Sequence, residues 1–170
     1  MIVPAIFVKD QANKKFTESC LRDPDKFKVF YNGDSLNFTP YDTSHDSTWY
    51  GYDFISMVND NVVGRLYFNC GRPTRIIDSV TIALYDEKYR MTFYKDLKTV
   101  LKMVHEANHP VLYFKTIAPT DAYDLYEKLC GQGYLEKCYK PHNFTIIRGK
   151  EYDWHEYAMT KENLGRFLEK

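Results

Sequence analysis

Residues 76–118 read IIDSVTIALYDEKYRMTFYKDLKTVLKMVHEANHPVLYFKTIA, and this stretch decides the fold class. Its first ten residues are rich in β-branched side chains, which favour a central strand at 76–85. The continuous apolar run at 111–118 is typical of a strand that is covered on both faces. A helix between the two strands predicts that they run parallel, because such crossovers connect parallel strands. The helix is indicated by apolar residues at the spacing of one buried face, namely Phe93, Leu97, Val100, Leu101 and Val104.

Further strands and helices are expected on both sides of this unit. The predicted elements outside residues 76–118 are a helix at 14–21, strands at 28–31, 53–58 and 62–69, a helix at 121–130, strands at 134–139, 143–148 and 152–159, and a helix from Thr160. The sequence therefore predicts an α/β (α+β) fold. We expect one domain over residues 1–170, with a mixed, mostly antiparallel central sheet and helices on both faces.

The composition excludes several classes of protein. The 170 residues carry 23 Lys+Arg and 23 Asp+Glu, so the chain lacks the excess of positive charge that a dedicated DNA-coating protein needs. Apolar runs are far shorter than the roughly 20 residues that span a bilayer. The opening MIVPAIFV also lacks the basic region of a signal peptide. We therefore expect a cytoplasmic protein, with neither a membrane nor a nucleic acid as its partner.

The four cysteines are scattered along the chain and form no C-x-x-C pair. This pattern favours reduced thiols and no bound metal. A disulfide stays open as an alternative. So does a zinc site, for which Cys130, Cys138 and His142 lie close together in the sequence.

One segment is acidic and aromatic. Residues 29–64 contain five Asp and no Lys or Arg, and they also hold several tyrosines. A solvated loop explains this composition. The functional alternative is a site for a cationic or aromatic partner, because carboxylates attract amines and tyrosines supply flat contact area. In that case Asp42, Asp46 and Asp53 should line a cleft that opens toward Tyr126.

The second half of the chain resembles the GNAT superfamily of acyl-CoA-dependent N-acyltransferases. The matching stretch is PTDAYDLYEKLCGQGYL, residues 119–135, in which the family's pattern is met by Ala122, Leu125, Tyr126, Gly133 and Tyr134. Pro119 stands where the family has Asn. The resemblance extends over residues 53–164, and as a divergent member the chain is similar to small phage-encoded GNAT-like proteins.

The resemblance implies an N-acetyltransferase that transfers an acetyl group from acetyl-CoA to an amine on a small molecule or a protein. It implies that Tyr126 is the acid for the leaving thiolate and that Asp78 is the base that accepts the amine proton. It also implies that backbone groups of Ala83, Leu84 and Tyr85 contact the pantetheine arm. From the residues alone, Tyr126 is explained equally well as a buried residue of the core. For Asp78 the alternative is a turn-forming residue at the start of a strand. His155 is a spare acid–base candidate.

The phosphate-binding loop departs from the family pattern. The family has R/Q-x-x-G-x-G/A here, whose glycines let backbone N–H groups approach the pyrophosphate. In EKYRMTFYKDL, residues 87–97, Arg90 matches the leading basic residue, but Phe93 and Lys95 replace the glycines. Arg90 and Thr92, a candidate N-cap, remain to contact phosphate. We therefore expect coenzyme A to bind weakly or not at all. The alternative function is a non-catalytic GNAT-fold structural or interaction protein, such as a virion or accessory component, with a protein as its partner.

Overall fold

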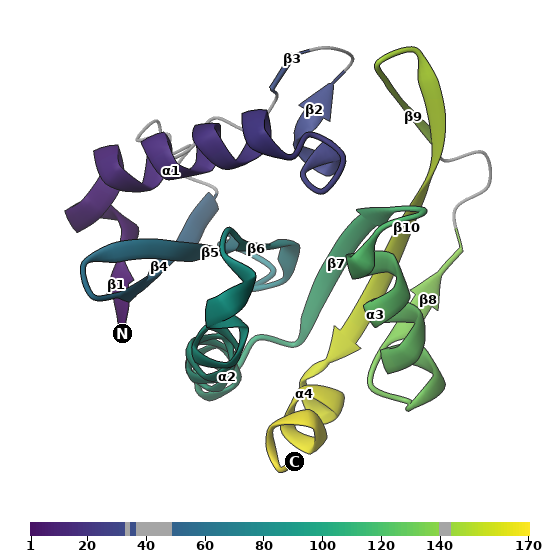
Figure 1. The fold of residues 1–170 in the computed structure, drawn as a ribbon. Coiled ribbons are helices and arrows are strands. Elements are labelled where there is room, and N and C mark those ends of the chain that lie inside the picture. The colour runs from purple at the N-terminus through teal and green to yellow at the C-terminus, as the bar shows by residue number, and fades with distance from the viewer. Residues whose placement is uncertain (33–34, 37–48, 140–143) are drawn as a thin grey trace.

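The computed structural model describes residues 1–32, 35–36, 49–139 and 144–170. Its main sheet has eight strands in the spatial order β1, β4, β5, β6, β7, β10 and β8, with β9 paired to β10 (Figure 1). These strands are β1 (Ile2–Pro4), β4 (Trp49–Val58), β5 (Asn61–Gly71), β6 (Ile77–Leu84), β7 (Val111–Ile117), β8 (Glu136–Cys138), β9 (Phe144–Ile147) and β10 (Lys150–Thr160). Two further strands, β2 (Tyr31–Asn32) and β3 (Ser35–Leu36), form a separate two-stranded sheet among the described residues.

Within the described residues, four α-helices and three short 3-10 helices connect the strands. The α-helices are α1 (Lys9–Arg22), α2 (Arg90–Glu106), α3 (Asp121–Gly131) and α4 (Lys161–Leu168). The 3-10 helices are η1 (Ala5–Val8), η2 (Lys28–Phe30) and η3 (Glu87–Tyr89). η3 leads directly into α2, so the chain turns sharply between the end of β6 and the first turn of that helix.

The parallel pair at the centre of the sheet confirms the main prediction from the sequence. β6 and β7 run parallel and are connected through α2, whereas the other pairs in the sheet are antiparallel. The hairpin of β4 and β5 is also confirmed. Its turn places Asn59 and Asp60 at φ angles of 48° and 61°. Asn and Asp tolerate this left-handed conformation better than most residues do.

Helices cover both faces of the sheet, as the sequence predicted. α2, α3 and α4 share one apolar cluster with β5, β6 and β7, and α1 belongs to a second cluster on the other face. In Figure 1, α1 lies on one side of the strands and α2 and α4 on the other. The predicted buried face of α2 is confirmed, because Phe93, Val100, Leu101 and Val104 are buried and Leu97 packs against them.

The N-terminal quarter differs from the prediction. The expected strand at 28–31 is wrong: residues 28–30 form η2, in which the amide of Phe30 donates to the carbonyl of Phe27. The rings of Phe27 and Phe30 stack and pack toward Phe16 of α1, so tertiary contacts override the β propensity of these residues. The first residues form β1, an edge strand beside β4 that the sequence analysis did not predict.

Candidate active site

The candidate site lies where β6 and β7 separate. Among the described residues, two bridges join these strands, Ile77–Leu112 and Val80–Phe114. The register shifts between the two bridges, which places an extra residue of β6 in a bulge. Beyond Val80, β6 continues to Leu84 while β7 continues to Ile117, so the sheet opens toward the carboxyl ends of its two parallel strands. Figure 1 shows the two halves of the sheet diverging at this point.

The open end of β6 carries the backbone groups that the resemblance assigned to pantetheine. Successive residues of a strand direct their N–H and C=O groups to opposite neighbours. The amide of Tyr85 donates to the carbonyl of Val63 in β5, at 2.8 Å. Ala83, two residues earlier, therefore also faces β5, and the backbone groups of Leu84 face β7. Of the three predicted residues, Leu84 is the one whose backbone is directed into the opening.

Both backbone groups of Tyr85, its N–H and its C=O, are hydrogen-bonded. Its carbonyl oxygen accepts a hydrogen bond from the Arg22 guanidinium, at 3.0 Å. Its ring is 2% exposed and packs near Phe16 and Phe27. Burial raises the pKa of the Tyr85 hydroxyl, which has no hydrogen-bond partner among the described residues. The side chain therefore closes the end of the strand on the α1 face.

Tyr126 lies over the point where the two strands part. Its ring contacts Phe114, the last residue of β7 that is paired with β6, at a centroid distance of 5.5 Å. On its other side it contacts Tyr157 of β10 at 5.4 Å. Burial raises the pKa of Tyr126, so its hydroxyl keeps its proton at neutral pH. The structure thus places Tyr126 both in the core and next to the opening.

Asp78 lies in the β6 bulge, just before the opening. Its Oδ1 atom is buried and has no hydrogen-bond partner among the described residues. Burial raises the pKa of the neighbouring Tyr67 hydroxyl, and the negative charges of Asp53 and Asp78 add to this effect. The Asp78 carboxylate therefore lies within electrostatic reach of the Tyr67 hydroxyl. Val80 and Tyr126 belong to the apolar cluster shared with α2.

The prediction for the acidic segment is wrong at the one position that the structure describes. Asp53 faces Arg65 on the α1 side of the sheet, away from the cluster that contains Tyr126. The two form a buried ion pair with distances of 2.8 Å and 2.5 Å, so the Asp53 carboxylate is already neutralised. Asp42 and Asp46 lie outside the described residues.

The first turn of α2 carries the residues predicted to contact phosphate. Arg90 is the first residue of the helix and is exposed, and Thr92, two residues further on, is half-buried. Thr92 is not the N-cap, because the helix begins at Arg90 and Tyr89 takes the capping position. The ring of Phe93 is 5% exposed and points into the core. The side chain expected to crowd the phosphates is therefore turned away from the start of the helix.

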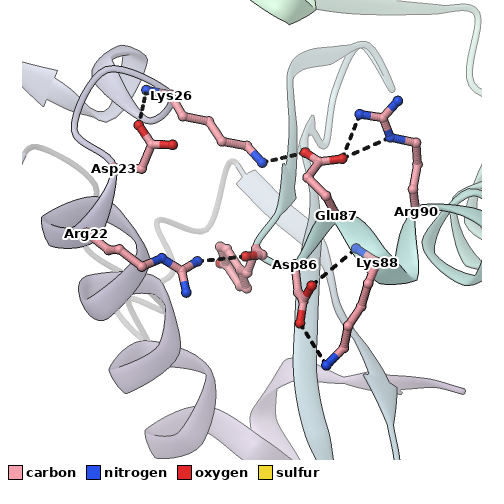
Figure 2. A network of polar contacts seen from close by, with 8 residues as sticks. Arg22, Asp23, Lys26, Asp86, Glu87, Lys88 and Arg90 are labelled. Carbon is pink, nitrogen blue, oxygen red and sulfur yellow. Dashed lines mark hydrogen bonds and ion pairs between the residues drawn. The ribbon is translucent and has the colours of Figure 1, made fainter.

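A network of charged side chains surrounds the turn between β6 and α2 (Figure 2). The Glu87 carboxylate accepts hydrogen bonds from the Lys26 ammonium at 2.5 Å and from the Arg90 guanidinium at 2.9 Å and 2.6 Å. Asp86 accepts from the backbone amide of Lys88 and also lies 3.4 Å from its ammonium group. Glu87 was not among the residues predicted from the sequence. Its spacing of three residues from Arg90 was a visible signal, but Lys26 is 61 residues away in the chain.

The structure also locates Thr120 and the spare acid–base candidate His155. The Thr120 hydroxyl caps α3 by accepting from the amide of Tyr123, at 3.1 Å. His155 lies beside the ring of Tyr123 at 4.8 Å, and burial together with the charge of Lys137 lowers its pKa. His155 is paired with Thr116 in the open half of β7, so it lies one strand away from the opening.

The four cysteines are free thiols, and Cys20 and Cys70 are buried. No group of three or more His, Cys, Asp or Glu is arranged to hold a metal ion in the part of the chain that the structure describes. His142 of the suggested zinc set lies outside that part. None of the described helices is both long enough and apolar enough to cross a membrane.

Comparison with solved structures identifies the fold. No protein-family model and no curated protein matches the sequence. A probable acetyltransferase of the GNAT family from Chromobacterium violaceum matches with a TM-score of 0.56 at 14% identity, over 82% of each chain. A spermidine N-acetyltransferase SpeG chimera from Vibrio cholerae and hSSAT gives a TM-score of 0.53 at 12% identity, over 72% of this chain and 71% of that chain. An N-acetyltransferase from Staphylococcus aureus gives 0.52 at 16% identity, over 65% and 68%. The chain therefore has a GNAT-like fold.

Proposed function

We propose that the protein is an N-acyltransferase that transfers an acetyl group from acetyl-CoA to an amine acceptor. The separation of β6 from β7 beyond Val80 is the observation that carries this proposal, because it leaves strand backbone free to receive an extended ligand. The GNAT-like fold supports it. The structural neighbours with the same fold are named as acetyltransferases, one of them acting on spermidine.

The residues present fit the cofactor in two places. Backbone groups of Leu84 face the opening, where amide-like groups of a pantetheine arm can extend the strand pairing. At the start of α2, the helix dipole and the cationic side chains of Arg90 and Lys88 favour a phosphate group. Phe93 leaves this helix end open because its ring is buried in the core. In this proposal Thr92 adds a hydroxyl in the same helical turn.

The reaction requires a base that accepts a proton from the attacking amine and a hydrogen-bond donor for the departing sulfur. Acetyl-CoA supplies an activated acyl group whose C–S bond breaks as a C–N bond forms. Asp78 accepts the proton that leaves the attacking nitrogen, for which its unpaired Oδ1 atom is available. The sulfur departs as a thiolate, to which the Tyr126 hydroxyl donates a hydrogen bond. In this proposal Asp78 acts from β6 and Tyr126 from α3.

A thiol-release assay with acetyl-CoA and a panel of primary amines tests this function. The panel should contain polyamines, lysine peptides and free N-terminal peptides. We expect release of coenzyme A thiol that depends on both protein and amine. Absence of release with every amine, together with no saturable binding of acetyl-CoA at millimolar concentration by folded protein, would overturn the proposal.

A second candidate is a non-catalytic GNAT-fold interaction protein, including the phage-type component that the sequence resemblance suggested. The observation that favours it is the glycine-free turn before α2, where Glu87 already binds Arg90 and Lys26. Such a protein would keep the fold without binding the cofactor. The acetyl-CoA titration separates the two candidates.

A further inference from the structure

The Glu87 carboxylate is held beside the start of α2 by two cationic side chains. It belongs to η3, directly before the first residue of α2, and it is bound by one cation from each side (Figure 2). Arg90 comes from the first turn of α2, and Lys26 comes from the segment after α1. Two cationic side chains from distant parts of the chain thus converge on one carboxylate.

The physical chemistry of this position favours an anion. Backbone N–H groups and the dipole make a helix N-terminus positive, and Arg90 and Lys26 add full charges. Hydrogen bonds from Lys26 and then from Arg90 hold the pKa of Glu87 below its ordinary value, so it is ionised at neutral pH. A diphosphate needs the same donors, and a second anion placed there would repel the first.

We propose that Glu87 is an internal competitor for the phosphate groups of the cofactor and sets the affinity of this site. The inference rests on the proposed function, because it assumes that a diphosphate binds at the start of α2. It would account for the weak binding of coenzyme A that the loop sequence predicts, even though cationic residues surround this turn. The missing glycines are then only one reason for weak binding, and the second is a carboxylate that must be displaced.

The contact also connects the phosphate position to α1. Arg22, the last residue of α1, donates to the carbonyl of Tyr85. Lys26, four residues after Arg22, binds the Glu87 carboxylate. A phosphate that takes over Arg90 releases Glu87, and the ion pair with Lys26 changes with it. Binding of the cofactor therefore changes the contacts of the segment that follows α1.

Isothermal titration of coenzyme A into the wild type and the Glu87→Gln variant tests the inference. Glutamine keeps the size of the side chain but removes the competing charge. Freeing the two cations from these exposed ion pairs should lower the Kd about fivefold, and by no more than about thirtyfold. The gain should shrink at about 0.5 M salt, because the attraction is electrostatic.

The matched control is Glu106→Gln, which removes an exposed carboxylate from the other end of α2, where it lies 3.9 Å from Lys102. It should leave the Kd unchanged within about twofold. If the wild type binds and Glu87→Gln binds equally or more weakly, the inference is overturned while the proposed function stands. If neither protein binds at millimolar ligand while both remain folded, the cofactor claim and the inference fall together.

Discussion

The ring of Phe93 packs directly over Gly64, so closely that a Cβ atom built on Gly64 would lie 2.4 Å from Cε2 of that ring. The same Cβ would also lie 2.6 Å from the carbonyl oxygen of Ala83. A phenylalanine at the start of α2 is thus matched by a glycine on β5. Phe93, which stands at a glycine position of the family's phosphate loop, is therefore buried in the core.

Replacing Gly64 by Ala should destabilise the fold by about 1–3 kcal/mol, because neither the ring nor the backbone carbonyl can give way without repacking. Urea denaturation measures the effect. The control is Gly131→Ala, at the end of α3, where an added Cβ meets nothing within 4 Å and should change stability by less than about 1 kcal/mol. Equal stability of the Gly64 variant and the wild type would contradict the packing described here.

Replacing Arg65 by Met should cost about 3–5 kcal/mol, because the variant leaves the Asp53 carboxylate buried and unpaired. The two side chains are 4% and 10% exposed. The double variant with Asp53→Leu should recover part of the loss, since it removes the orphaned charge. Lys102→Met breaks an exposed pair and should cost less than about 1 kcal/mol. A loss no larger in Arg65→Met than in Lys102→Met would contradict the prediction.

The stability of the protein should fall in acid partly through Glu127. This carboxylate accepts hydrogen bonds from Lys137 at 2.7 Å and Tyr157 at 2.6 Å, and these hold its pKa below the ordinary 4.5. Because the folded pKa is the lower one, the contribution is present above pH 4.5 and is lost as the pH falls through the folded value. The pair is partly exposed, so we expect it to contribute at most about 1 kcal/mol to the free energy of unfolding.

Glu127→Gln should therefore be less stable than the wild type at neutral pH and nearly equal to it in acid. A difference that is constant across about pH 3–7 in urea denaturation would contradict this assignment.

Removing the hydroxyl of Tyr126 should lower kcat without unfolding the protein. Tyr126→Phe keeps the ring between Phe114 and Tyr157 but cannot donate to the leaving sulfur, so we expect kcat to fall at least about tenfold with KM for acetyl-CoA unchanged. The control is Tyr134→Phe, a buried tyrosine whose ring lies against Phe167. An equal kcat in the Tyr126→Phe variant and the wild type would return Tyr126 to a purely structural role.

Asp78→Asn should separate activity from stability. An amide cannot accept the amine proton, so we expect kcat/KM to fall by about a hundredfold or more, with the loss smallest at high pH. The free energy of unfolding should stay the same or rise in this variant. The buried Oδ1 atom of Asp78 has no hydrogen-bond partner among the described residues, and in asparagine this position no longer shares the negative charge of a carboxylate. Retained activity with reduced stability would indicate that Asp78 is a turn-forming residue.

The sequence predicted the elements whose signal is local and long. The apolar spacing of α2 and the β-branched run of β6 are strong patterns, and together they define the parallel crossover. α1 was predicted too short because its buried residues are few and widely spaced, Ala12, Phe16 and Cys20 among them. The strand expected at 28–31 was wrong because an aromatic contact with α1, not local propensity, decides that turn.

The candidate site was predictable only in part, because its contacts join residues far apart in the chain. The pattern at 119–135 singled out Tyr126 through the resemblance, and the structure locates its ring against Phe114, next to the opening. The position of Phe93 depends on Gly64, 29 residues earlier by numbering and on another strand. Likewise, the partner of Glu87 is Lys26, and no local pattern connects the two.

Backbone amide chemical shifts, followed by NMR during titration with acetyl-CoA to millimolar concentration, test the central claim most directly. We predict saturable shifts concentrated at Leu84, at Met91 and Thr92 in the first turn of α2, and at Lys115 in the open half of β7. Residues at the closed end of the pair, such as Ile77 and Leu112, should change little. Shifts confined to other parts of the molecule, or none at all in a folded sample, would contradict the claim that the cofactor binds between β6 and β7.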